Sequence, residues 1–374
     1  MTAFARTDRS ALAEWWWSVD RWTLAALLAL VGFGSLLVMA ASPAVAERIG
    51  TDDLHFVKRY FLVLPLAAAT LFVVSLQTPK TVRRIAVVVF LVSLLLVAFT
   101  FVGGVEIKGA RRWINLPGFA LQPSEFVKPS FAVVAAWMFS EQRLNPRFPG
   151  NAVAIGLFLL VVGMLVKQPD LGMAVVVAAV WFTQFFLAGL RLYWVVAGVG
   201  CGALALTGAY FTFSHVALRI NQFFDRGDGG DGYQVNRSME AFMHGGLWGQ
   251  GPGEGTVKGS LPDAHADFVF AVAGEELGLV ACLVIVALFA FIVLRGFARM
   301  LQEHNFFVVL AATGLFVQFG LQAVINMAST LHLMPTKGMT LPFISYGGSS
   351  MLALGLGMGM ALALTRRRFG GVET

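Results

Sequence analysis

The chain has 374 residues, of which 57% are hydrophobic and only 13% are charged, and its formal net charge is +6. Together with a mean hydropathy of +0.75 and repeated apolar runs of about twenty residues, this composition excludes a soluble globular protein. The 27 Lys and Arg residues are spread over short connectors and do not form a patch. We therefore expect a multi-spanning membrane protein that contacts membrane lipid and no nucleic acid.

The apolar runs predict an all-α fold, because an open segment in lipid satisfies its backbone polar groups only as a helix. Ten transmembrane helices are expected, in a membrane domain of residues 23–365 that follows an N-terminal segment, 1–22, and precedes a C-terminal tail, 366–374. The expected spans are 23–42, 60–77, 85–103, 126–140, 150–167, 171–189, 192–213, 269–294, 305–327 and 347–365. Cys201 and Cys282 both fall within these spans, so no disulfide framework is implied.

An even number of spans puts both termini on the same side of the membrane. Basic residues are denser in the connectors of that side, for example at Lys80, Arg83 and Arg84, than in the longer connectors of the other side. The positive-inside rule therefore predicts cytoplasmic termini. It also predicts that residues 214–268, between the seventh and eighth helices, form a large extracytoplasmic (periplasmic) loop.

One outward connector, residues 104–125, carries basic residues on the side that should be poor in them. Arg111 and Arg112 precede Trp113, and Lys128 follows in the next helix. Arg suits an anionic ligand such as phosphate, because its planar group donates to two oxygens at once. The alternative is that these side chains reach for lipid headgroups. Trp113 is interpreted either as an anchor at the membrane interface or as a surface against which a ligand packs.

The large loop is rich in glycine and polar residues. Asp225, Asp228 and Asp231 recur at steps of three, whereas a calcium-binding EF-hand needs steps of two and a later Glu. The glycine-rich run 245–253 lacks the Gly-Lys-Ser/Thr of a Walker loop. Neither pattern therefore predicts a cation or nucleotide site.

The loop closes with two acids on either side of His265. If the eighth helix continued outward through this stretch, Asp263 and Asp267 would share one face. Like charges in a partly desolvated place favour proton uptake, as a general base requires. A helix-capping role explains Asp263 alone, but not the deeper Asp267. One His between two acids does not establish a metal site, and none is predicted.

Two more acids, Glu275 and Glu276, lie about two turns further into the same helix. Burying them is costly without partners, so basic residues from other connectors are expected to converge on them. The short Pro169–Asp170 turn is expected to cap the sixth helix.

Seven motifs, in matching order, resemble the signature set of the SEDS family of bacterial cell-wall synthesis. They are ARRWI at 110–114, QPSE at 122–125, QPDLG at 168–172, GYQ at 232–234, LPDAHADF at 261–268, GEELG at 274–278 and PFISYGGSS at 342–350. The resemblance covers about residues 20–366, and PTKGMTLP at 335–342 is more similar to the division branch of the family than to the elongation branch. Asp263, Ala266 and Gly259 depart from the residues usual in the family.

The resemblance implies a ten-helix peptidoglycan glycosyltransferase of the bacterial inner membrane that polymerises lipid II at the division septum. Its implied partners are a class B penicillin-binding protein of the FtsI type and other division proteins. Asp267 is the expected general base. The expected substrate-binding residues are Arg111, Arg112, Trp113, Lys128, Arg219, Lys337, Asp263, His265 and Ser345. By itself, Lys337 reads equally well as a loop lysine. A divalent cation, Mg²⁺ or Mn²⁺, could help to neutralise pyrophosphate, although the sequence identifies no ligands for it.

Two other functions remain open. A transporter that flips lipid II should show inverted repeats or a charged path through the whole membrane, and the sequence shows neither. A non-catalytic scaffold for division enzymes leaves Asp267 and the misplaced arginines unexplained.

Overall fold

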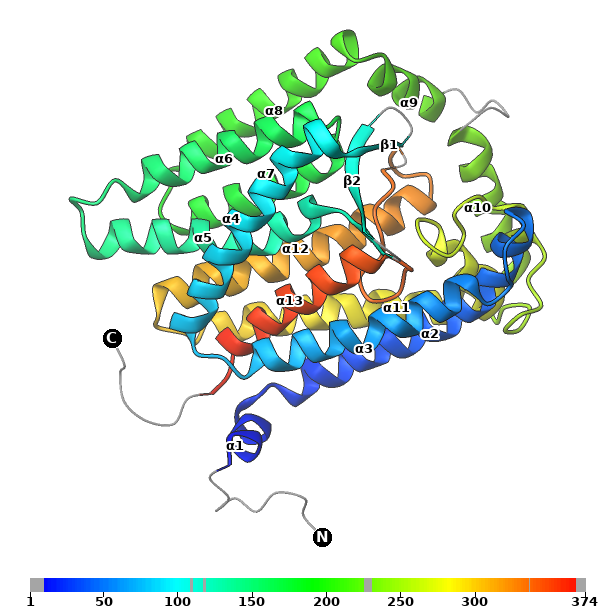
Figure 1. The fold of residues 1–374 in the computed structure, drawn as a ribbon, viewed down its shortest axis with the longest axis horizontal. Coiled ribbons are helices and arrows are strands. Elements are labelled where there is room, and N and C mark those ends of the chain that lie inside the picture. Colours follow the sequence, from blue (N-terminus) through cyan, green and yellow to red (C-terminus); the bar gives the residue numbers. More distant parts are fainter. Residues whose placement is uncertain (1–9, 108–109, 117–118, 225–230, 336, 368–374) are drawn as a thin grey trace.

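Two helices, α12 (Phe306–Thr330) and α13 (Gly348–Leu364), lie at the centre of a helical bundle (Figure 1). Almost every side chain of α13 is buried, whereas the outer helices expose large apolar side chains. The computed structural model describes residues 10–107, 110–116, 119–224, 231–335 and 337–367. An apolar perimeter around a buried centre is the arrangement expected of a bundle surrounded by lipid.

Each predicted span corresponds to a helix. These helices are α2 (Arg21–Arg48), α3 (His55–Ser75), α4 (Pro79–Gly103), α5 (Pro123–Leu144), α6 (Gly150–Lys167), α7 (Leu171–Leu187), α8 (Leu192–Thr212), α11 (Val269–Met300), α12 and α13. Within the described residues, seven of them are long and apolar enough to cross a membrane, namely α2, α3, α4, α6, α8, α11 and α12. Of the remaining three, α7 and α13 have 17 residues each, and α5 carries charged residues.

Polar residues between the apolar runs determine where the helices begin. The side chains of Asp20, Thr78, Asp170 and Asn305 accept hydrogen bonds from the first turns of α2, α4, α7 and α12. Such N-caps satisfy N–H groups that have no partner within the helix. The cap that was expected at Asp170 is therefore confirmed.

At one end of the bundle, Asp20 binds two arginines of α11. Its carboxylate lies 2.6 Å from Arg295 Nε and 2.9 Å from Arg299 Nε. Burial alone would raise the pKa of Asp20, but the hydrogen bond from Arg295 and the charge of Arg299 lower it below its ordinary value. The buried Asp20 and these two half-buried arginines join the start of α2 to the end of α11.

The described ends of the chain meet at the same place. Arg366, just after α13, donates to Ser18 Oγ and to the Leu76 carbonyl, both at 2.9 Å. Ser18 belongs to α1 (Ala11–Ser18), a short helix in the N-terminal segment. The start of α2 and the end of α13 therefore lie at the same end of the bundle, as expected for an even number of crossings.

The opposite end carries the connectors that the sequence singled out. The large loop contains helices α9 (Ser214–Phe224) and α10 (Asp231–Gly245) and a short 3₁₀ helix, η1 (Val257–Ser260). Its residues 225–230, which include Asp225 and Asp228, lie outside the described residues.

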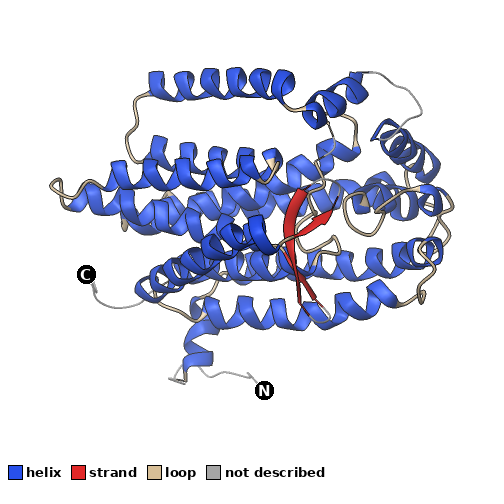
Figure 2. Cartoon of the chain, turned by 45° about the horizontal axis from the view of Figure 1, so that its top comes forward, coloured by secondary structure: helices blue, strands red, loops and turns tan. Residues whose placement is uncertain are grey.

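The all-α prediction is wrong for one connector. Strands β1 (Val105–Ile107), β2 (Ala110–Leu116) and β3 (Phe119–Leu121) form an antiparallel sheet in that order. Figure 2 shows them in red beside the helices. Apolar and polar residues alternate in Val105–Ile107, and β-branched residues occur in β1 and β2, which favours strands. This pattern is only a few residues long, and it was overlooked between two long apolar runs that predict helices.

We call the end of the bundle that carries the three strands the sheet end. We predict that this end faces the outside of the cell membrane. In a protein whose Cys201 and Cys282 are replaced by Ser, a single Cys at exposed Glu254 should react with a membrane-impermeant maleimide in intact spheroplasts. A single Cys at Lys80, exposed at the start of α4, should react only after permeabilisation, because the positive-inside rule puts it in the cytoplasm. The reverse labelling pattern would contradict the orientation.

Candidate active site

Several elements at the sheet end contact the segment between α12 and α13, residues 331–347. We call this segment the α12–α13 connector. Two buried amides of α12 hold it. Asn326 Nδ2 donates to the Met339 carbonyl at 2.6 Å, and Gln322 Nε2 donates to the Thr340 carbonyl at 3.0 Å. Because buried carbonyls need partners wherever water is excluded, these amides allow a non-helical segment to lie inside the bundle.

The half-buried carboxylate of Asp267 adjoins this connector. Its Oδ2 lies 3.4 Å from the position that a Cβ on Gly338 would occupy. Gly338 has a φ of +58°, which glycine adopts without strain. The same Asn326 amide also donates to the Asp267 backbone carbonyl at 2.9 Å. Asp267 and the connector are therefore fixed relative to each other by one side chain.

The stretch before α11 forms turns, and the helix begins only at Val269. The N–H groups of Ala266 and Asp267 donate to the Asp263 carbonyl at 2.9 and 3.1 Å. Asp263 has a φ of 52°, which an α-helix cannot contain. The helical continuation that would align the two carboxylates is therefore not formed. Asp263 is exposed, whereas Asp267 is half-buried.

Two more predicted residues fasten this stretch to the connector. Ser345 Oγ donates to the Ala266 carbonyl at 2.6 Å and accepts from the Leu341 N–H at 2.8 Å. The Tyr346 N–H donates to the His265 carbonyl at 2.9 Å. Ser345 is buried, so in this structure its hydroxyl holds the backbone next to Asp267.

The ring of His265 is buried against Phe56, with their centroids 4.1 Å apart. Its Nδ1 makes no hydrogen bond with any residue that the structure describes. Burial lowers the pKa of His265 to about 4, although the charge of Asp263 acts in the opposite direction. His265 is therefore a neutral packing residue at pH 7.

Arg112, on β2, binds the turn that starts α7. Its Nε donates to the Gln168 carbonyl at 3.0 Å, its guanidinium also donates to the Pro169 carbonyl, and its Nη1 lies 3.5 Å from Asp170 Oδ2. Burial raises the pKa of Asp170, and the charge of Arg112 opposes that rise. The guanidinium thus holds the sheet against this turn.

Lys337 is the chain neighbour of Gly338, the glycine that adjoins the Asp267 carboxylate. It precedes Gly338, is half-buried, and its Cδ lies 3.5 Å from the position that a Cβ on Gly172 would occupy. Its aliphatic stem therefore packs on the first turn of α7, beside the turn that Arg112 holds.

Lys128, by contrast, is buried beneath the connector. Its Nζ lies 2.8 Å from Glu125 Oε2 and donates to Gln322 Oε1 at 2.9 Å. Since Gln322 in turn holds Thr340, Lys128 supports the connector from below.

The remaining predicted residues lie away from this group. Arg111 is exposed on the other face of β2, as alternation along a strand requires, and it pairs with Glu106 at 3.2 Å. It lines a hollow of about 200 Å³ together with Lys167. Trp113 is half-buried opposite Val105 in the sheet. Arg219 belongs to α9, but its side chain lies outside the described residues.

No resident metal site is assigned. Among the residues that the structure describes, no three His, Cys, Asp or Glu side chains are grouped so that they could hold an ion.

The amides of α12 were missed from the sequence. Gln318, Gln322 and Asn326 recur every four residues, so they lie on one face of an otherwise apolar helix. That stripe was the available signal, because an amide inside a membrane helix normally has a buried partner.

The comparisons with known proteins agree with this architecture. A sequence model of the FtsW/RodA/SpoVE family, described as "Cell cycle protein", matches residues 21–369. The "Probable peptidoglycan glycosyltransferase FtsW" of Caulobacter vibrioides is 45% identical over 373 residues, which is 98% of this chain and 94% of that protein. The protein of the same name from Trichlorobacter lovleyi is 36% identical over 336 residues, 87% of each chain. The chain therefore belongs to the FtsW/RodA/SpoVE family.

Solved structures show the same fold. The rod shape determining protein RodA of Thermus thermophilus is 28% identical, with a TM-score of 0.69 over 94% of this chain and 97% of its own. A chain from a peptidoglycan synthase complex is also 28% identical, with a TM-score of 0.77 over 93% of this chain and 97% of its own. The family predicted from the seven motifs is confirmed, and the names of the curated relatives agree with the predicted enzyme class.

We predict that His265 makes stability depend on pH. Its pKa is about 4 in the folded protein against 6.5 ordinarily, so the unfolded chain takes up a proton that the folded protein does not. Stability should therefore fall as pH drops from 6.5 to 4, by up to about 3 kcal/mol. The Tm in detergent should fall less between pH 7 and pH 5 for His265→Gln than for wild type. Equal falls would contradict this assignment.

A second prediction concerns Arg112. Arg112→Met leaves the buried Asp170 without its guanidinium and should cost on the order of 3 kcal/mol of stability, measured as a loss of Tm. Arg111→Met is the matched control, because its ion pair is exposed and should be worth less than about 1 kcal/mol. Asp170→Asn should restore part of the loss in the Arg112→Met protein. Equal effects of the two arginine variants would refute the assigned role of Arg112.

Proposed function

We propose that this protein is a peptidoglycan glycosyltransferase that polymerises lipid II, a disaccharide-peptide linked to undecaprenyl pyrophosphate. Its membership of the FtsW/RodA/SpoVE family and the names of its curated relatives support this activity. So does the gathering of the predicted functional residues at one end of the bundle, where the head of a lipid-anchored substrate would lie. The reaction joins the sugar of one lipid-linked disaccharide to the anomeric carbon of another and releases the pyrophosphate lipid.

Asp267 is the proposed general base that takes the proton of the attacking hydroxyl. One observation carries this assignment: the half-buried Asp267 carboxylate adjoins Gly338, and its own backbone carbonyl is bound by the buried Asn326 amide. A base held in this way needs little reorganisation before it accepts a proton. Asp263, by contrast, is exposed.

Lys337 is the proposed cation for the departing pyrophosphate, because it neighbours Gly338 and therefore Asp267. Fixed positive charge stabilises a leaving group that becomes more negative in the transition state. Arg111 and Arg219 remain predicted phosphate contacts, and Trp113 a predicted contact of the lipid-linked sugar. Arg112, Lys128, His265 and Ser345 would act indirectly, through the backbone and side chains that they hold. A divalent cation, Mg²⁺ or Mn²⁺, stays a prediction, and no step depends on it.

The proposed setting is the division septum of the inner membrane, with both termini in the cytoplasm and a class B penicillin-binding protein of the FtsI type as partner. The FtsW name of the relatives supports the division role. The likeness to a chain of a peptidoglycan synthase complex, whose published description concerns polymerization and crosslinking, supports a partner that crosslinks.

A lipid II transporter and a non-catalytic scaffold are the competing functions. The ion pairs and buried amides around the α12–α13 connector lie at one end of the bundle, whereas a transporter needs a polar path between both ends. A scaffold does not require a half-buried acid held by buried amides.

The deciding experiment compares wild type with Asp267→Asn in lipid II polymerisation, each co-purified with its penicillin-binding partner, whose transpeptidase is blocked. We expect the variant to lose at least about 100-fold in rate, since a positioned base contributes about 10² to 10⁴. Asp263→Asn is the comparison variant, because its exposed side chain is a predicted substrate contact and not the base, and it should lose much less rate than Asp267→Asn.

Each alternative has its own outcome. Equal chain lengths on a gel for wild type and Asp267→Asn would refute Asp267 as the base. A wild type that makes no chains but moves labelled lipid II across liposomes would favour the transporter. Retained partner binding without either activity would favour the scaffold.

A further inference from the structure

Two fully buried acids, Glu275 and Glu276, lie at a break in α11. Gly278 has a φ of 79° and a ψ of 179°, which interrupts the helix. In an unbroken helix, the carbonyls of the two acids would accept from the N–H groups of Leu279 and Val280. Here those four backbone groups are available to another segment.

The glycine-rich run 245–251 supplies the missing partners, so the break is closed by a second piece of chain. Its four hydrogen bonds are Gln250 N–H to the Glu275 carbonyl (2.9 Å), Gly251 N–H to the Glu276 carbonyl (3.0 Å), Leu279 N–H to the Gly246 carbonyl (2.9 Å) and Val280 N–H to the Leu247 carbonyl (3.2 Å). A gap in a membrane helix is tolerated when its backbone groups are satisfied in this way.

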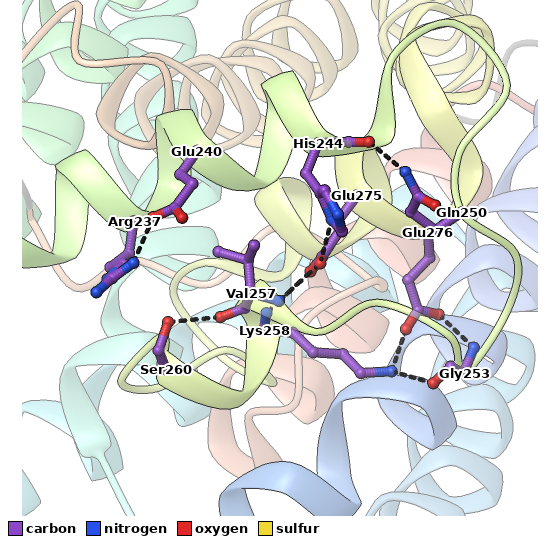
Figure 3. A network of polar contacts seen from close by, with 10 residues as sticks. All are labelled: Arg237, Glu240, His244, Gln250, Gly253, Val257, Lys258, Ser260, Glu275 and Glu276. Carbon is purple, nitrogen blue, oxygen red and sulfur yellow. Dashed lines mark hydrogen bonds and ion pairs between the residues drawn. The ribbon is translucent and has the colours of Figure 1, made fainter.

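The two carboxylates bind the next part of the loop, as Figure 3 shows. The two oxygens of Glu275 accept from the N–H groups of Val257 and Lys258 at 2.7 and 2.9 Å. One of them also lies 3.1 Å from His244 Nδ1. Glu275 is thus held by backbone N–H groups and one imidazole, whereas the basic side chain expected from the sequence, Lys258, pairs with Glu276.

Glu276 binds the same part of the loop from the other side. Its Oε2 accepts from the Gly253 N–H at 2.9 Å, and its Oε1 pairs with Lys258 Nζ, which also donates to the Gly253 carbonyl at 2.9 Å. Both side chains of the Lys258–Glu276 pair are buried. Charge-assisted hydrogen bonds shielded from water in this way are strong. We call Glu275, Glu276 and Lys258 the acid clamp.

The clamp closes a loop of chain around Asp267. The bond from the Lys258 N–H to Glu275 joins residues that are 17 apart in the sequence, and Asp267 lies between them. Leu261 and Ala264, within the same loop, are fully buried. The α12–α13 connector binds the backbone next to Asp267. The clamp fixes residues 253–258, the backbone that leads into the turn containing Asp267.

Resting on the proposed role of Asp267 as the base, we infer that Glu275 and Glu276 are positioning residues for it. They hold residues 253–258 against α11, and this sets where the chain enters the turn that carries Asp267. Their carboxylates act through the backbone and need not touch substrate. A base displaced by about 1 Å can lose about 100-fold in rate, so loosening the clamp should slow catalysis more than it weakens substrate binding.

One pair of glycine variants tests the clamp without changing any charge. A Cβ on Gly255 would lie 2.8 Å from Glu275 Cδ, so Gly255→Ala forces the carboxylate or the loop to move. A Cβ on Gly259 meets nothing within 4 Å, so Gly259→Ala is the matched control in the same loop. In the complex with the penicillin-binding partner, Gly255→Ala should lower kcat for lipid II about 100-fold with KM changed less than about threefold. Gly259→Ala should leave both constants within about twofold of wild type.

Glu276→Gln supplies the second test, because it removes the charge and keeps the size of the side chain. If Glu276 acts through Asp267, its effect on kcat should disappear in the residual activity of the Asp267→Asn protein, since residues that act as a unit are not additive. Asp20→Asn controls for general destabilisation, because Asp20 is a buried acid that pairs with the opposite end of the same helix. It should lower Tm without the selective loss of kcat.

The outcomes separate the two proposals. Full activity of Asp267→Asn would refute Asp267 as the general base, and the positioning role of the clamp would then be refuted as well. An inactive Asp267→Asn together with a folded Gly255→Ala that keeps wild-type kcat would overturn the clamp alone. If Gly255→Ala fails to fold, Glu276→Gln decides, and an equal loss of rate in both Asp267 backgrounds would show a merely structural role.

Discussion

The requirement that every buried backbone polar group find a partner within the protein underlies the whole arrangement. Lipid offers no hydrogen bonds, so non-helical chain inside the bundle needs donors and acceptors from neighbouring elements. Asn326 and Gln322 provide them for the α12–α13 connector, and the run 245–251 provides them at the Gly278 break. The α12–α13 connector can therefore lie beside Asp267, and the run 245–251 can close the break in α11.

Buried charges obey the same rule, and they mark the two ends of the bundle differently. Asp20 with Arg295 and Arg299 ties helices together at one end. At the other end, the Lys258–Glu276 and Arg112–Asp170 pairs tie loops and strands to helices. Removing one partner of such a pair leaves an uncompensated charge, which is costly in a low dielectric. Pairs of this kind give the connectors around Asp267 a definite conformation although they lack regular structure.

The sequence was a good guide where one strong pattern decided the outcome. Apolar runs located the ten expected helices but not α9 and α10 of the large loop, and the cost of burying Glu275 and Glu276 correctly required partners. The sequence was a poor guide where a short local pattern conflicted with a longer one. The three strands were hidden among helices, and Asp263 adopts a positive φ that ends the expected helical face. The adjacent Arg111 and Arg112 were considered together, but alternation along β2 sends one to an exposed pair and the other to a buried turn.

What the sequence by itself determined was the class of protein, its apolar helical runs and its family, and it singled out Asp267 as the candidate base. These follow from composition, periodicity and motif order, which are local properties of the chain. Only the tertiary structure decided which residues surround Asp267, because Asn326, Gly338 and Ser345 come from segments far from Asp267 in the sequence. Their meeting depends on how α11, α12 and α13 pack, and no local pattern encodes the pairing of one particular amide or carboxylate with one particular backbone group.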